Sequence, residues 1–241
     1  DSVGLSALTT YYYRVRAIYA YGGSPLMGEP QAAWYFNNNY DDASGNNKLL
    51  TPGGTTFDAA DKIEGSHSTA YDGSSQFIDV NTSNGDYLRG GYAAKTVAFW
   101  MKSASNTGNR VVIDFGGSDD GLSVRLDANT LYAGIASNNT RRSLSTPYSS
   151  TGWNHITLVY SINTFRLYVN GTLVASNLSL GFSGASVGTT SNASRIGGTN
   201  GTNSFNVAGT TFFSGRLDDF RIYDVALSQE DVTSLINNTV I

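Results

Sequence analysis

The sequence contains no cysteine in its 241 residues, which excludes disulfide bonds, thiolate metal sites and cysteine nucleophiles. Its only histidines are His67 and His155, too few for a Ser/His/Asp triad or a zinc site with sensible spacing. The glutamates Glu29, Glu64 and Glu230 are isolated, whereas a retaining glycosidase needs two carboxylates about 5–5.5 Å apart. We therefore expect a protein without enzymatic activity, in which His155 has a structural role.

Charged residues are also scarce. They make up 14% of the chain, and the net charge of −4 comes without a basic run, so nucleic-acid binding is not expected. No run of about 18 apolar residues occurs, and we expect no membrane insertion. The hydrophobic content of 40% is nevertheless ample for a core. A composition rich in Asn, Thr, Ser, Gly and Tyr with few Lys and Glu favours an extracellular location, either secreted or at the cell surface.

Short stretches of alternating apolar and polar residues dominate the chain. In the first long one, Val97, Phe99 and Met101 share one face of an extended strand. Asn170-Gly171 has the two residues that a type I′ hairpin turn requires at positive φ. Many short strands with regular turn signals predict an all-β sandwich or jelly roll. The clearest strands are expected at 95–103, 110–115, 121–127, 130–136, 153–161, 164–169, 172–176 and 214–224.

One helix and two long loops complete the pattern. Ser228 is placed as an N-cap, with Asp231 three residues later as in a capping box. Val232, Leu235 and Ile236 then form an apolar stripe, which predicts a short C-terminal helix. Residues 37–56 and 181–206 are rich in Gly, Asn, Ser and Thr and are expected to be loops. Long loops on a rigid β scaffold often carry binding residues, although they can also be simple surface excursions.

The order of these segments resembles a known family. The stretches "FWMKS", "GWNHITLVYS", "FRLYVNGTLVAS", "RIGG" and "FSGRLDDFRIYDVALSQEDVTSLI" are similar in sequence and order to the LamG (laminin G-like) domains. Upstream, "STAYDGSSQFIDV" and "AWYFNNNYDDASGN" resemble the early strands of that family. The resemblance implies that residues 33–241 form one LamG-like domain. Its expected fold is a concanavalin A-like jelly-roll sandwich of two antiparallel sheets with one short C-terminal helix.

Residues 1–32 resemble a different fold. The stretch "TTYYYRVRAIYAYGGSP", which begins at Thr9, is similar to the C-terminal strands of a fibronectin type III domain, with Tyr11 as its corner tyrosine. We expect a partial fibronectin-like segment here, cut off from the rest of its module. The alternative is that residues 1–30 pair with another chain and build a homo-oligomer, because an unpaired strand is a template for strand addition. In that case the protein is a structural subunit of an extracellular filament or surface assembly.

The family resemblance also implies a structural Ca²⁺ ion. In many concanavalin A-like modules an Asp at the start of the last strand binds such an ion together with groups from the early segment. The matching residues are Asp218 and Asp219, and the early candidates are Asp41, Asp42 and Asp72. Alternation along the strand directs Asp218 inward and leaves Asp219 to pair with Arg221. The alternative is that both carboxylates are hydrogen-bonded within the protein without an ion.

Glycan binding requires aromatic faces that stack on sugars, and polar groups that hydrogen-bond their hydroxyls. Four tyrosines in or beside the predicted loops are candidates: Tyr40, Tyr92, Tyr132 and Tyr148. The alternative is that they cap the edges of the sheets. The three tryptophans lie at family motif positions and are expected in the core. We therefore predict a non-catalytic carbohydrate-binding or adhesion module of a larger secreted or surface protein. Its expected partner is a polysaccharide, a cell-surface glycan or another protein surface.

Overall fold

The computed structural model describes residues 28–80, 88, 91–183, 186–190, 192–199, 201–206 and 211–237. Residues 1–27 lie outside this part, so the fibronectin-like segment and the donated strands remain predictions. In the part of the chain that the structure describes, no helix has the length and apolar character needed to cross a membrane.

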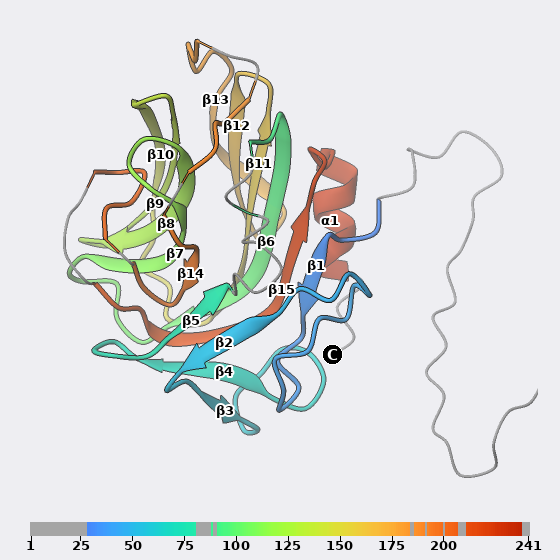
Figure 1. The fold of residues 1–241 in the computed structure, drawn as a ribbon. Helices are drawn as coiled ribbons and strands as arrows, with labels where there is room; N and C mark the ends of the chain where they lie inside the picture. The colour runs from blue at the N-terminus through green and yellow to red at the C-terminus, as the bar shows by residue number, and fades with distance from the viewer. Residues whose placement is uncertain are drawn as a thin grey trace, which may run out of the picture.

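The described residues fold into two antiparallel sheets and one helix (Figure 1). The eight-stranded sheet has the order β13 (Thr172–Asn177), β12 (Thr164–Val169), β11 (Trp153–Ser161), β6 (Ala94–Ser103), β15 (Ser214–Tyr223), β4 (Ser68–Asp72) and β3 (Thr56–Asp58), with β1 (Ala32–Trp34) pairing separately with β15. The seven-stranded sheet has the order β10 (Thr140–Pro147), β9 (Thr130–Ser137), β8 (Gly121–Asp127), β7 (Arg110–Gly116), β14 (Arg195–Ile196), β5 (Phe77–Val80) and β2 (Leu50–Gly53). The predicted jelly-roll sandwich is confirmed.

The core lies between the two sheets and follows the alternation in the sequence. Val97, Phe99 and Met101 are all fully buried in one cluster, as their shared face predicts. The Phe99 ring stacks on Phe220 of β15 at 5.0 Å between centroids. β15 is a central strand, because it pairs with β6 on one side and with β4 and β1 on the other. The C-terminal motif therefore completes the sandwich from its middle.

Tight turns fix the register of the hairpins. Asn170 and Gly171 have φ values of 49° and 76°, which confirms the turn predicted between β12 and β13. The two-residue loops Ala128–Asn129 and Asn138–Asn139 also have positive φ at both positions. They join β8 to β9 and β9 to β10, so these three strands form a continuous meander with a fixed pairing.

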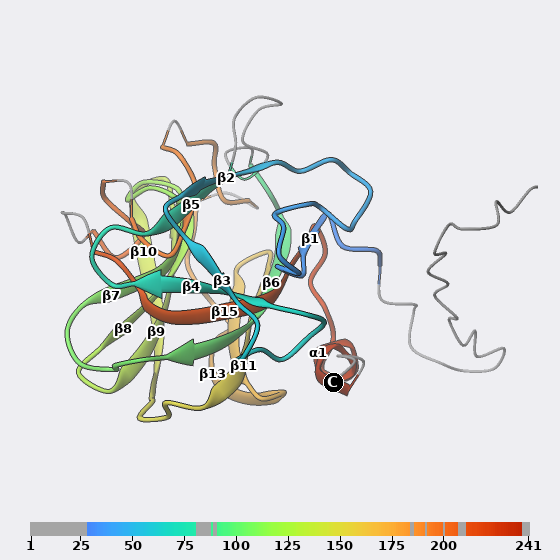
Figure 2. The same ribbon diagram turned by 90° about the horizontal axis from the view of Figure 1, so that it is seen from below.

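The helix α1 (Gln229–Asn237) covers one part of the outer face of the eight-stranded sheet (Figure 2). The capping box is present as predicted: the Ser228 amide donates to Asp231 at 3.0 Å, and the Asp231 amide donates to the Ser228 hydroxyl at 3.2 Å. Val232 and Leu235 are buried against a cluster from β6, β11, β12 and β15. Its sheet members are Ala98, Val159, Tyr168 and Tyr223.

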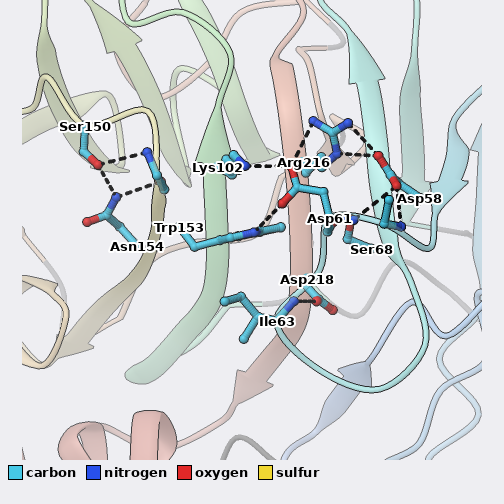
Figure 3. Close-up of polar contacts among 12 residues, drawn as sticks. Asp58, Asp61, Ile63, Ser68, Lys102, Ser150, Trp153, Asn154, Arg216 and Asp218 are labelled. Carbon is cyan, nitrogen blue, oxygen red and sulfur yellow. Dashed lines mark hydrogen bonds and ion pairs between the residues drawn. The ribbon is translucent and has the colours of Figure 1, made fainter. Parts of the chain in front are cut away.

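A second segment covers another part of the same outer face. We call residues 58–67 the strap. Its Asp61 carboxylate accepts hydrogen bonds from Lys102 at 2.7 Å and from the Trp153 indole at 2.9 Å (Figure 3). At the start of the strap, Asp58 pairs with Arg216 at 2.6 Å. Lys102 is the register partner of both Trp153 and Arg216, so the strap is anchored across three adjacent strands.

These contacts correct one expectation about the tryptophans. Trp34 is fully buried in the core, as predicted. Trp100 and Trp153 are half-buried instead, and Trp153 donates its indole N–H to the strap. They lie on the outer side of the eight-stranded sheet, because alternation gives the core-facing positions of β6 to residues such as Phe99 and those of β11 to residues such as Leu158.

Candidate functional site

The outer face of the seven-stranded sheet is partly covered by residues 199 and 201–206, which we call the segment 199–206. Its Thr199 hydroxyl donates to the buried Asp114 of β7 at 2.6 Å. The Ser204 amide donates to the hydroxyl of Ser123 on β8 at 3.2 Å, and that hydroxyl itself donates to Asp114 at 3.0 Å. These bonds fix the segment over β7 and β8. Its last residues therefore lie beside the meander of β8, β9 and β10.

A hollow of about 240 Å³ opens between this segment and the meander. We call it the β8–β10 hollow. Residues from three strands and from the segment 199–206 line it: Arg125, Tyr132, Arg141, Arg142, Ser143, Ser204 and Phe205. Since β8, β9 and β10 are joined by two-residue turns, the strand residues of this set come from one continuous meander.

Arg125 is one of the lining residues and is held by three contacts. Its guanidinium lies over the Tyr132 ring at 4.2 Å and over the Phe205 ring at 5.1 Å. It also pairs with Asp127 at 3.0 Å. Arg125 and Tyr132 are direct register partners on β8 and β9, so the stack follows from the strand pairing.

Gly134 makes room for the aromatic wall of the hollow. A Cβ at this position would lie 2.6 Å both from the Phe205 ring and from the Ser204 hydroxyl. Any larger residue would therefore push the segment away from the sheet. The close approach lets Phe205 meet Tyr132 edge to face, with 6.5 Å between ring centroids and an interplanar angle of 80°.

The sequence and the fold together place this chain in a family. Residues 72–233 match the family model of the concanavalin A-like lectin/glucanases superfamily, in its laminin G form. The chain belongs to this superfamily. A search of curated protein sequences found no match to the chain.

Solved structures share the concanavalin A-like fold. The receptor-binding domain of botulinum neurotoxin D is similar with a TM-score of 0.67 and 18% identity, over 87% of this chain and 52% of that one. A structure of botulinum neurotoxin type C gives 0.65 and 17%, over 88% and 52%. The binding domain of neurotoxin DC in complex with rat synaptotagmin II gives 0.64 and 16%, also over 88% and 52%. This chain thus spans about half the length of these structures, and the likeness shows the fold.

The four predicted tyrosines of this concanavalin A-like domain are not brought together. Tyr132 lines the β8–β10 hollow. The Tyr40 hydroxyl shares a hydrogen bond of 2.7 Å with Thr55, and its ring lies 4.7 Å from Phe57. The Tyr92 ring meets Tyr160 edge to face at 5.8 Å. Tyr148 has only 4% of its surface exposed, so it offers little ring surface to a ligand.

The two predicted aspartates on β15 differ in environment. Asp218 is fully buried and accepts hydrogen bonds from the backbone amides of Ile63 at 2.7 Å and Glu64 at 2.9 Å. Burial raises the pKa of Asp218 to about 6, although these amide bonds act in the opposite direction. Asp219 pairs with Arg221 at 2.8 Å, as alternation predicts, and its φ of 44° lies within a β-bulge.

The early aspartates each serve their own loop. Asp42 accepts hydrogen bonds from the amides of Ala33 at 3.0 Å and Lys48 at 2.8 Å. Burial raises the pKa of Asp42, but these bonds outweigh it and leave the pKa below its usual value. Asp72 caps its own turn, where amides led by that of Ser75 hold its pKa well below the usual range. Asp41 is exposed, and of the other candidates only Asp42 is next to it in the sequence.

No three acidic or histidine side chains of the described residues lie close enough together to hold a metal ion. Among the five candidates, Asp218 uses its oxygens for backbone amides, and Asp219 uses both of its oxygens for Arg221. Calcium binding therefore stays a prediction, made from the resemblance and without a ligand cluster to support it.

Sequence reasoning did not find the arginines or Phe205. Alternation in 121–127 places Arg125 and Asp127 on the polar face of the strand. From this pattern, an arginine on the outer face of the sheet could have been predicted. The pairing of Arg125 with Tyr132 follows from the two-residue turn between the strands. Phe205 lies in the predicted loop 181–206, and nothing local indicates that this loop folds over β8.

Proposed function

We propose that this domain is a carbohydrate-binding module of a larger secreted or cell-surface protein. The observation that carries the proposal is the stack of Arg125, Tyr132 and Phe205 in the β8–β10 hollow. Half-buried aromatic rings offer apolar surface to the C–H face of a sugar, and the arginines and Ser143 offer hydrogen bonds to its hydroxyls.

Other parts of the outer surfaces of the sandwich are covered by segments of the chain. The outer face of the eight-stranded sheet carries α1 and the strap. The part of the seven-stranded sheet over β7 and β8 carries the segment 199–206. Ser204 and Phe205 of that segment line the hollow, and its aromatic wall is already assembled.

The relatives support a binding role in two ways. The superfamily is named for lectins as well as glucanases. Among the structures with the same fold, botulinum neurotoxin type C depends on two ganglioside molecules to enter cells, and neurotoxin DC is bound to rat synaptotagmin II. Both glycan and protein partners thus occur among proteins of this fold.

The lining favours binding over glucanase chemistry. Hydrolysis of a glycosidic bond requires an acid and a second carboxylate on opposite sides of the bond. None of the described residues that line the hollow is an aspartate or glutamate. Asp127 and Asp119 lie outside the lining and pair with Arg125 and Arg141. We therefore propose that the domain does not turn over the glycan that it binds.

A glycan array with three proteins tests the proposal. Wild type is expected to bind a defined set of sugars, and Tyr132→Ala is expected to bind them about tenfold more weakly, because one ring and the support of Arg125 are lost. Tyr35→Ala serves as the control, since Tyr35 is also half-buried but follows β1 on the other sheet. It should bind like wild type.

Two outcomes would overturn the proposal. One is an array on which wild type binds no sugar. The other is equal loss of binding in the Tyr132→Ala and Tyr35→Ala variants, which would place the ligand elsewhere. Melting temperatures of all three proteins show whether a loss of binding reflects unfolding.

A further inference from the structure

We propose that the β8–β10 hollow selects sugars that carry an acidic group, either a carboxylate or a sulfate. This inference rests on the proposed function and adds the chemical class of the ligand. It starts from the arginines: Arg125 comes from β8, and Arg141 and Arg142 come from β10, so three guanidinium groups line one hollow of about 240 Å³.

The charges of these arginines are only partly balanced. Asp127 pairs with Arg125 at 3.0 Å, but its side chain is 38% exposed. Asp119 reaches Arg141 at 3.5 Å, and its side chain is 61% exposed. An exposed pair such as Arg141–Asp119 contributes little, so Asp119 balances the charge of Arg141 only weakly. Since no carboxylate lines the hollow itself among the described residues, its lining is positive in a chain whose net charge is −4.

Many of the guanidinium donors are unused. Each guanidinium has five N–H groups. Within the described residues, one hydrogen bond is found for the Arg142 guanidinium, to the Arg141 carbonyl at 2.9 Å. One is likewise found for the Arg141 guanidinium, to Asp119. The Nε atoms of Arg125 and Arg141 are buried and have no hydrogen-bond partner among the described residues. A carboxylate or sulfate accepts several N–H bonds at once, whereas a neutral hydroxyl accepts at most two.

Arg125 is also ordered before a ligand arrives. The rings of Tyr132 and Phe205 hold its plane, and Asp127 holds its end. Its side chain is only 16% exposed. Because little rotamer freedom remains to be lost, binding of a carboxylate or sulfate at this group costs less than at a free surface arginine.

The size of the hollow sets the scale of the ligand. Pockets for drug-sized ligands occupy roughly 300–1,000 Å³, so a hollow of about 240 Å³ suits a single sugar residue. We infer that one acidic sugar residue occupies the hollow, with its ring near Tyr132 and its acidic group toward the three arginines. The neighbouring residues of the glycan then extend over the outer face.

Two matched pairs of probes test this inference by calorimetry on the full chain. The carboxylate pair is an oligogalacturonate and its carboxyl-reduced neutral form. The sulfate pair is a sulfated isomalto-oligosaccharide and its unsulfated form. The acidic member of at least one pair is expected to bind at least tenfold more tightly than its neutral partner. The pair with the larger ratio identifies which acidic group the hollow prefers.

Three single-charge variants show where that preference arises. Arg141→Gln and Arg142→Gln are each expected to reduce affinity for the acidic probe about threefold to tenfold, with little change for the neutral one. Arg166→Gln is the matched control, because Arg166 is a half-buried arginine on β12 of the other sheet. It removes the same charge and should leave the ratio unchanged. Melting temperatures confirm that each variant is folded.

The failures of the two proposals are distinguishable. If neither pair of probes nor any array sugar binds, the proposed function fails. If sugars bind and require Tyr132 but the acidic and neutral members bind equally, the carbohydrate-binding role stands and the acidic selectivity is wrong. An acidic preference that Arg166→Gln weakens as much as Arg141→Gln would also contradict the inference, since it would reflect net charge alone.

Discussion

His155 shows how a single residue in the sheet depends on its surroundings. It lies on β11 with 2% of its surface exposed, and its ring meets Trp100 edge to face at 5.2 Å. Its Nδ1 shares a hydrogen bond of 3.1 Å with the Thr157 hydroxyl. Burial, together with the nearby charge of Arg221, lowers the pKa of His155 to about 3. The structural role expected from the sequence is consistent with these contacts.

This environment predicts a pH dependence of stability. Between its ordinary pKa of about 6.5 and its folded value of about 3, His155 binds a proton in the unfolded chain but not in the folded one. The free energy of unfolding should therefore fall as the pH is lowered through this window, by up to about 1.4 kcal/mol per pH unit. Urea denaturation of wild type and His155→Phe at several pH values measures the effect. Phenylalanine keeps the contact with Trp100 but cannot titrate.

The comparison isolates His155 from its neighbours. Asp218 acts in the opposite sense between about pH 4 and 6, because burial raises its pKa to about 6. That contribution is present in both proteins and cancels in their difference. Identical slopes for wild type and His155→Phe would show that the buried imidazole does not control this part of the profile.

At the scale of elements, local patterns and distant contacts have different roles. The strands, the Asn170–Gly171 hairpin and the capped helix were predictable, because alternation, turn residues and caps act over a few positions. The strap and the segment 199–206 were not. They are held by Asp218 and by Asp114, whose partners lie far away in the sequence. The candidate site was not predictable for the same reason, because its lining comes from three strands and a loop that are brought together only by the fold.

The strap gives a prediction at this scale. Asp218→Ala removes a fully buried acceptor for the amides of Ile63 and Glu64 in the half-buried strap and of the buried Asp219. Unpaired buried amides are costly, and we expect the free energy of unfolding to fall by about 2–4 kcal/mol at neutral pH. Hydrogen exchange measured on peptides from the strap should also become faster than in wild type.

Asp72 offers a matched control. It also accepts hydrogen bonds from three backbone amides, those of Ser74, Ser75 and Gln76, but it is exposed in a turn. Since water can replace its oxygens, Asp72→Ala should cost much less and leave exchange in the strap unchanged. Equal losses in the two variants would mean that burial of Asp218 is not what makes it important.

For the whole molecule, the segments that lie on the outer faces of the two sheets limit where a ligand could bind. Two sheets enclose one core, α1 and the strap cover parts of one outer face, and the segment 199–206 covers part of the other. The aromatic and basic hollow lies where that segment meets the meander of β8, β9 and β10. The fold class followed from the sequence, whereas this division of the surface depended on how loops distant in sequence dock on the sheets.

One measurement tests this account most directly. The isotopically labelled full chain is titrated with the sugar that binds best on the array, and amide chemical shifts are followed by NMR. We expect the largest changes on Arg125, Tyr132, Arg141 and the neighbours of Phe205, with the strap and α1 unchanged. Changes confined to the strap, to α1 or to the outer face of the eight-stranded sheet, with the hollow unaffected, would contradict it.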